Sequence, residues 1–95
     1  MSEPATSIRL RIQGRVQGVW YRGWAAVQAR ELGLSGWVRN RQDGSVEALI
    51  SGPETRVRAM IERCYRGPPA ARVDRVVEEP AAEAATSGFR QLPTI

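Results

Sequence analysis

The chain opens with an alternating pattern of apolar and polar residues and then changes to a helical one. Apolar residues occupy every second position from residue 8 to 12, which is typical of a strand with one buried face. From residue 21 to 33 they recur every three or four positions, and Gly33 stands where a helix end is expected. The pattern therefore predicts a strand and a helix with a short loop between them.

A hairpin and a second helix follow. Residues 36–41 and 45–51 have the composition of strands, and they are separated by an Asp-Gly hairpin turn. A Pro-Glu pair at residues 53–54 favours a helix start, and a Gly-Pro-Pro run at residues 67–69 predicts where that helix ends. The apolar stripe of this helix, which we expect to face the core, consists of Val57, Met60, Ile61 and Cys64.

The last part of the chain carries weaker signals. Residues 72–79 predict another strand, and residues 80–88 form an alanine-rich connection without a clear pattern. Residues 89–92 predict a short edge strand, where Pro93 is tolerated. The order β-α-β-β-α-β is that of the ferredoxin-like, split βαβ plan. We therefore predict an α+β fold with an antiparallel four-stranded sheet and both helices on one face.

Length and composition limit the chain to one domain. Its 95 residues are 42% apolar and 25% charged, which suits one domain at residues 1–95 with a flexible N-terminal segment at residues 1–6. The longest apolar run is far too short to span a bilayer, and residues 1–7 lack the pattern of a signal peptide. Since Cys64 is the only cysteine, no internal disulfide can form. We expect a cytoplasmic monomer with no membrane partner.

The positive charge of the chain is unevenly distributed. All 14 basic residues are arginine, and the net charge is +4. Residues 1–30 contain five arginines and one glutamate, whereas residues 31–95 contain nine arginines and nine acids, so the whole excess lies in the first segment. A nucleic-acid-binding surface usually spreads its positive charge more widely. We therefore expect no nucleic-acid partner.

Residues 14–22, between the first strand and the first helix, have the features of a cradle for an oxyanion. Gly14 and Gly18 can adopt positive φ, which lets successive N–H groups point into one concave nest. The following helix presents unpaired N–H groups and the positive end of its dipole. Arg22 stands near the helix start, where a cation is unfavourable unless an anion lies beside it. Taken alone, however, such an arginine is more often a solvated surface residue.

The residues that are missing restrict the chemistry of such a site. The chain contains no histidine and no lysine, and the lack of histidine excludes Ser-His and Cys-His nucleophile systems and most zinc sites. Phosphoryl transfer suits an anion site of this kind, because positioned donors meet most of the charge in its transition state. If the leaving group is a carboxylate, no general acid is needed to expel it. Acyl phosphates meet that condition.

Two segments resemble the signatures of the acylphosphatase family. The first is Ile12-x-Gly14-x-Val16-Gln17-Gly18-Val19-x-Tyr21-Arg22. The second is Gly36-Trp37-Val38-Arg39-Asn40, followed by Asp43-Gly44-Ser45-Val46-Glu47 and then Gly52. The resemblance covers residues 8–79 and implies a ferredoxin-like fold. It also implies hydrolysis of small acyl phosphates to a carboxylate and inorganic phosphate.

The resemblance further implies a role for each matched position. The catalytic residues would be Arg22, which binds the phosphate bidentately, and Asn40, which orients the attacking water. A proton of that water would pass to the substrate's own phosphate, so no metal ion, cofactor or protein base is implied. The loop N–H groups that would hold the phosphate are those of Gly14, Arg15, Val16, Gln17, Gly18 and Val19.

The chain also departs from the family pattern. Tyr21 stands where phenylalanine is usual and adds a hydroxyl group that needs a partner. Arg41 replaces a common threonine after the key asparagine, which would place another cation beside the site. Trp20 and Trp37 flank the two motifs and could line the acyl side of the substrate, although packing is the commoner role of tryptophan.

Two other functions are compatible with the same fold. The first is a non-catalytic module that binds phosphate or RNA. RNA-recognition sheets stack bases on aromatic residues of their central strands, and residues 8–12 and 45–51 contain none. The second is the acylphosphatase-like segment of larger carbamoyl-transfer proteins. The short length and free N-terminus of this chain favour a separate enzyme.

Overall fold

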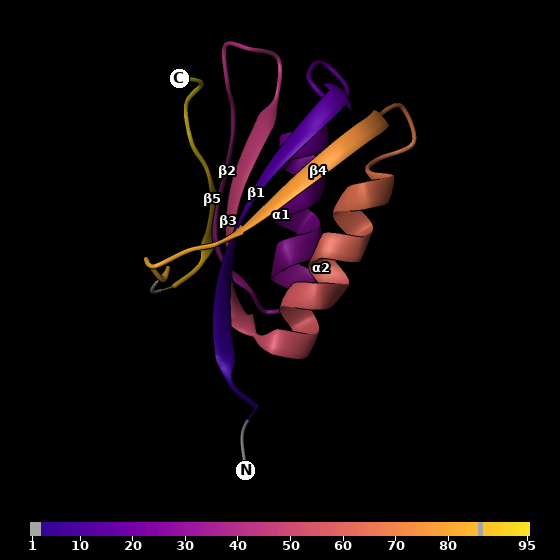
Figure 1. Cartoon of the computed structure of the whole chain (residues 1–95). Coiled ribbons are helices and arrows are strands. Elements are labelled where there is room, and N and C mark those ends of the chain that lie inside the picture. The colour runs from indigo at the N-terminus through magenta and orange to yellow at the C-terminus, as the bar shows by residue number, and fades with distance from the viewer. Residues whose placement is uncertain (1–2, 86) are drawn as a thin grey trace.

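Five strands form one sheet, and two helices pack against one of its faces (Figure 1). This computed structural model describes residues 3–85 and 87–95. The strands lie in the order β4-β1-β3-β2-β5. Their bounds are β1 (Ala5–Arg15), β2 (Ser35–Asn40), β3 (Val46–Pro53), β4 (Arg72–Pro80) and β5 (Phe89–Gln91). The helices are α1 (Tyr21–Glu31) and α2 (Glu54–Arg66).

The pairing of the strands follows the split βαβ plan. β1 to β4 pair only in antiparallel fashion, as the order of the elements predicts. The predicted ferredoxin-like α+β fold is therefore confirmed. The sheet is larger than the predicted four strands, because β4 lies at one edge and β5 pairs with β2 at the opposite edge (Figure 1). β5 runs parallel to β2, so the complete sheet is mixed rather than purely antiparallel.

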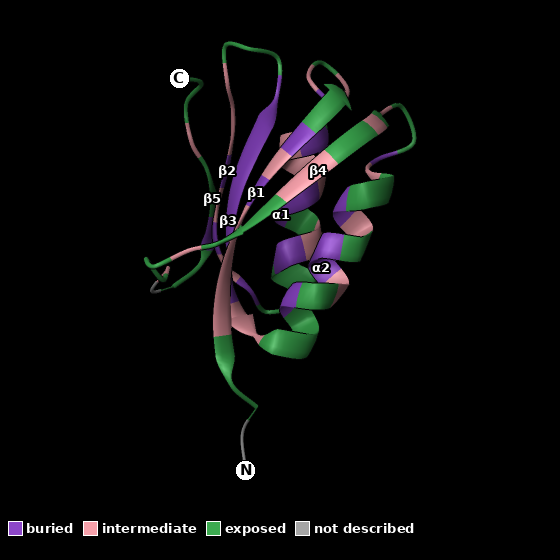
Figure 2. Cartoon of the chain, in the orientation of Figure 1, coloured by how far each residue is buried: buried purple, intermediate pink, exposed green. Residues whose placement is uncertain are grey.

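The core lies between the sheet and the helices. Leu10 and Ile12 of β1 are fully buried, because the alternation along the strand turns them toward the helices. Figure 2 shows that the buried parts of α1 and α2 face the sheet. The predicted stripe of α2 is buried at every position: Val57, Met60, Ile61 and Cys64. Each large apolar side chain buried in this way stabilises the fold by about 1.5–3 kcal/mol, and this packing fixes the helices relative to the strand ends.

The ends of some elements differ from the sequence pattern. β1 extends beyond residues 8–12 because its backbone pairs with β3 on one side and β4 on the other. α1 ends at Glu31 rather than residue 33. Of the segment 1–6, Met1 and Ser2 lie outside the described residues, while Ala5 and Thr6 pair with β3. No helix within the described ranges is long and apolar enough to cross a membrane.

Candidate active site

Residues 16–20 connect β1 to α1, and glycines in this loop and at the end of β1 have unusual backbone angles. Gly14 has a φ of 131° at a bulge in the β1–β4 pairing, and a side chain there would collide with the Arg72 carbonyl group. Gly18 has a φ of 75°. Residues with side chains rarely adopt such angles. The loop therefore has the backbone freedom that an anion nest requires.

The N-terminus of α1 is the positive end of the helix dipole, and no acidic residue of the first turn neutralises it. Trp20 precedes the helix and gives no side-chain cap, and the first turn contains no acidic residue. The first amide groups of a helix lack intrahelical partners, so this end favours an anion. Arg22 lies in the same turn and is partly buried, and its side chain forms no hydrogen bond or ion pair with residues 3–85 and 87–95. The local charge therefore favours an anionic ligand.

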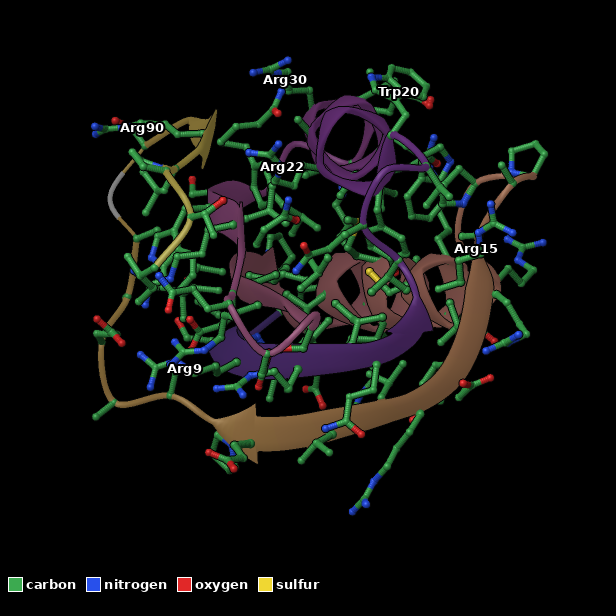
Figure 3. The ribbon with its side chains drawn as sticks, turned by 90° about the horizontal axis from the view of Figure 1, so that it is seen from above. Arg9, Arg15, Trp20, Arg22, Arg30 and Arg90 are labelled. Atoms are coloured by element: carbon green, nitrogen blue, oxygen red, sulfur yellow. The ribbon has the colours of Figure 1, made fainter. Side chains whose placement is uncertain are left out.

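A small pocket of about 140 Å³ opens where the loop, α1, β2 and β5 meet. It brings Arg22 together with Asn40, although the two belong to different elements. Figure 3 shows that Arg22 and Trp20 project in different directions from the start of α1. The lining residues of the pocket are Val16, Gln17, Gly18, Trp20, Tyr21, Arg22, Gly23, Asn40 and Gln91.

Three of the predicted site residues do not line this pocket. Gly14 lines a neighbouring hollow beside the hairpin turn. Arg15 is exposed at the end of β1 and pairs with β4, and in Figure 3 it lies near the end of the β4 ribbon, away from Arg22. Val19 is partly buried and packs against the hydrophobic core. Of the predicted positions, the lining includes only Val16, Gln17, Gly18, Arg22 and Asn40.

The side chain of Gln17 links the loop to the hairpin that carries Asn40. Gln17 Nε2 donates one hydrogen bond to the Arg41 carbonyl oxygen at 2.8 Å and a second to the Ser45 carbonyl oxygen at 2.9 Å. These two carbonyl groups lie on either side of the hairpin turn. The sequence predicted only a backbone role for Gln17, because no pattern indicates where a polar side chain finds a distant carbonyl partner.

A buried carboxylate on the open face of the sheet holds the residues on both sides of Asn40. Arg39 Nε and Arg41 Nη1 donate to Glu47 Oε1 at 2.8 and 3.0 Å, and the Glu47 side chain is only 6% exposed. Burial tends to raise the pKa of Glu47, but the hydrogen bonds from Arg39 and Arg41 outweigh it and hold the pKa below its ordinary value. The Arg41 guanidinium is therefore engaged on the open face and is not an additional cation in the pocket.

The last residues of the chain also contribute to the site. Gln91 of β5 lines the pocket. Beyond it, the Ile95 N–H donates to the Asn40 carbonyl oxygen at 3.2 Å, and the Ile95 carbonyl accepts from the Gln42 N–H at 2.9 Å. Sequence reasoning missed these contacts because backbone groups, which every residue carries, make them.

The aromatic residues near the two motifs have different roles. The Tyr21 hydroxyl donates to the Cys64 carbonyl oxygen at 2.6 Å, which supplies the partner that this hydroxyl needs. Burial raises the pKa of Tyr21 above its ordinary value, and it also raises the pKa of the Cys64 thiol to about 12, so Cys64 is a packing residue. Trp37 lies outside the pocket, with the Arg39 guanidinium 4.6 Å above its ring. Among the described residues, no cluster of three or more histidine, cysteine, aspartate or glutamate side chains could hold a metal ion.

Comparison with known proteins decides the family. Residues 8–91 match the sequence profile of the acylphosphatases. The chain belongs to the acylphosphatase family. A curated acylphosphatase from Rhizorhabdus wittichii is 55% identical over 87 residues, which cover 92% of this chain and 88% of the relative. The resemblance predicted from the two motifs is therefore confirmed.

Solved structures agree with this assignment. An acylphosphatase from Coxiella burnetii matches with a TM-score of 0.89 and 35% identity, over 93% of both chains. HypF from T. kodakarensis matches with a TM-score of 0.81 and 30% identity, over 92% of this chain but only 12% of HypF. A similar fold thus also occurs as a small part of a larger protein.

Proposed function

We propose that this protein is an acylphosphatase, which hydrolyses the carboxyl–phosphate bond of small acyl phosphates to a carboxylate and inorganic phosphate. The observation that carries the proposal is a single pocket that both Arg22 and Asn40 line. Arg22 comes from the first turn of α1, which contains no acidic residue, and Asn40 comes from a separate hairpin. Membership of the acylphosphatase family supports the same reaction.

The phosphoryl group binds between the loop and the start of α1. The amide groups of residues 16–18, which line the pocket, and those of the first helical turn donate to its oxygens. Arg22 has no partner among the described residues, so its guanidinium can form a bidentate pair with two phosphoryl oxygens. A preorganised donor of this kind stabilises the transition state by about 3–4 kcal/mol.

Asn40 orients the water molecule that attacks phosphorus. Its side-chain oxygen accepts a hydrogen bond from the water and holds it in line with the acyl oxygen that leaves. A bond forms between the water oxygen and phosphorus while the bond from phosphorus to the acyl oxygen breaks, and the electron pair leaves on the carboxylate. A proton of the water passes to a phosphoryl oxygen. Because a carboxylate is a stable leaving group, no protein acid is required.

This mechanism requires no metal ion or cofactor, since Arg22 and the amide groups supply the positive charge. We further propose that the protein is a cytoplasmic monomer. Its one cysteine is free and buried, which suits a reducing compartment and leaves no exposed thiol to link two copies through a disulfide. No membrane partner is proposed. No nucleic-acid partner is proposed either, because on the open face the central strands β1 and β3 carry arginines and Glu47 rather than base-stacking aromatic residues.

The test is hydrolysis of benzoyl phosphate in the presence of EDTA. We expect the wild-type protein to release phosphate under these conditions. Arg22→Ala should lower kcat/KM at least about 100-fold, because it removes a donor aimed at the transition state. Asn40→Ala should lower kcat by a similar factor. Arg58→Ala is the matched control, since Arg58 is an exposed arginine of α2 that pairs only loosely with Glu78, at 3.8 Å.

Several results would contradict the proposal. Activity that persists in both the Arg22 and Asn40 variants would overturn the site assignment. Loss of activity with EDTA would overturn the metal-independent mechanism. If the wild-type protein instead released no phosphate but bound RNA in a salt-dependent manner, a binding module would be the better description.

A further inference from the structure

Trp20 is a large apolar side chain that the fold leaves in water beside the candidate site. It is 66% exposed, more than any other large apolar side chain of the described residues. An isolated exposed apolar residue needs no explanation by itself. Trp20, however, also lines the pocket that contains Arg22 and Asn40.

The backbone of Trp20 is in a conformation that a bulky residue rarely adopts. Its φ of 67° and ψ of 26° lie in the left-handed region, and among the described residues it is the only one other than glycine with a positive φ. The Trp20 carbonyl oxygen accepts the Trp24 N–H at 3.0 Å, so the residue is fixed to the start of α1. The backbone from which the indole ring projects is therefore fixed relative to the loop and the helix.

The indole ring packs against the first turn of α1. Its Nε1 and Cδ1 atoms lie against Gly23, where any side chain would collide with the ring. Gly23 itself lines the pocket. The ring is thus held at the pocket mouth, with part of its surface against the helix and most of it open to solvent.

The proposed binding mode places the acyl group at the same position. The phosphoryl group occupies the small pocket between the loop and Arg22, so the acyl group must extend out of the pocket mouth. A flat aromatic acyl group can stack on the exposed indole there. An acetyl group offers no such ring.

We propose that Trp20 is a specificity-determining residue, which binds the acyl group and favours acyl phosphates with a flat aromatic acyl group over small aliphatic ones. This inference rests on the proposed function. Trp20 takes no part in the bond-breaking step, so its removal changes substrate preference rather than the chemistry.

The test compares kcat/KM for benzoyl phosphate with kcat/KM for acetyl phosphate. In Trp20→Ala, the ratio of the two values should fall about twofold to twelvefold, the range expected for a lost aromatic contact. Trp20→Phe should retain most of the ratio. Gly23→Ala should also lower it, because the new methyl group displaces the indole. If Trp20→Ala fails to fold, Trp20→Gly serves instead, since glycine accepts the left-handed angles.

Two controls separate this inference from the proposed function. Tyr65→Ala removes another exposed aromatic ring, 49% exposed on α2, and should leave the ratio unchanged. Inhibition by inorganic phosphate should change by less than about twofold in Trp20→Ala, because phosphate does not reach the indole. An unchanged ratio in an active Trp20→Ala protein would overturn the inference alone. Failure of the wild type to hydrolyse either substrate would overturn both it and the proposed function.

Discussion

Gln17 connects the two parts of the candidate site through one side-chain group. Its Nε2 donates to the carbonyl oxygens of Arg41 and Ser45, at 2.8 and 2.9 Å, while its backbone belongs to the loop. In the proposed mechanism the loop holds the phosphoryl group, and the hairpin carries Asn40. Gln17 therefore acts as a positioning residue that fixes the distance between the phosphorus atom and the attacking water.

We expect Gln17→Ala to lower kcat for benzoyl phosphate about tenfold or more, because a small misplacement of reacting groups slows a reaction strongly. KM should change by less than about threefold, since the loop amides and Arg22 remain. Steady-state kinetics measures both quantities. The control is Gln42→Ala, an exposed glutamine of the hairpin turn. A large rise in KM with an unchanged kcat would contradict the positioning role.

At the scale of elements, one buried hydrogen bond joins the two helices. The Tyr21 hydroxyl of α1 donates to the Cys64 carbonyl of α2 at 2.6 Å, and the Tyr21 side chain is buried. Tyr21→Phe keeps the ring but removes this bond, so the free energy of unfolding should fall by about 0.5–1.5 kcal/mol. For a chain of this size that corresponds to a melting temperature lower by roughly 2–12 °C.

Thermal unfolding monitored by circular dichroism measures this change. Tyr65→Phe is the matched control, because the Tyr65 hydroxyl bonds to Glu78 at 3.0 Å on the exposed surface. Its melting temperature should stay close to the wild-type value. An equal fall in the melting temperature of both variants would show that the buried hydrogen bond between the helices stabilises the protein no more than the exposed one.

The elements differ in how far the sequence alone predicts them. The buried stripe of α2 and the alternation of β1 follow from local periodicity, so both were predicted correctly. β5 has only three residues, and its parallel pairing with β2 places it at the edge of the sheet opposite to β4, which precedes it in the chain. The position of β5 follows from long-range pairing, which local periodicity does not encode.

The residues of the candidate site likewise differ in how far the sequence alone predicts their positions. The motifs placed Arg22 and Asn40 on a loop–helix junction and a hairpin, and the structure brings them to one pocket. They did not indicate that Gln91 lines that pocket or that Gln17 reaches two distant carbonyl groups. Such contacts depend on the tertiary fold and are therefore visible only in three dimensions.

At the scale of the whole molecule, one buried carboxylate joins three strands of the sheet. Glu47 of β3 accepts hydrogen bonds from Arg39 and Arg41, at 2.8 and 3.0 Å, and two further guanidinium groups approach within 3.9 Å. The latter belong to Arg9 and Arg11 of β1. Arg9 also pairs with Glu83 and Arg11 with Asp43, but only Glu47 lies against arginines from both sides of β3. Its protonation should therefore weaken the pairing of β3 with both of its neighbours.

The pH dependence of stability tests this role. The pKa of Glu47 is below the ordinary value of 4.5 in the folded protein, because hydrogen bonds from the two arginines outweigh its burial. Its contribution is therefore complete above about pH 4.5 and is lost as the pH falls through the lower, folded-state pKa. At pH 7, Glu47→Gln should reduce the free energy of unfolding by about 1–3 kcal/mol. Urea unfolding at a series of pH values measures the difference between this variant and the wild type.

That difference should shrink as the pH falls below about 4.5, because the wild-type carboxyl group then becomes neutral like the glutamine. The pKa of Asp43 is also lowered, by hydrogen bonds from Ser45, but Asp43 is present in both proteins and so does not affect the comparison. Glu62→Gln, at an exposed position of α2, should remain within about 0.5 kcal/mol of the wild type at every pH. A constant difference between Glu47→Gln and the wild type from pH 7 to pH 3 would mean that the charge of Glu47 does not hold the strands together.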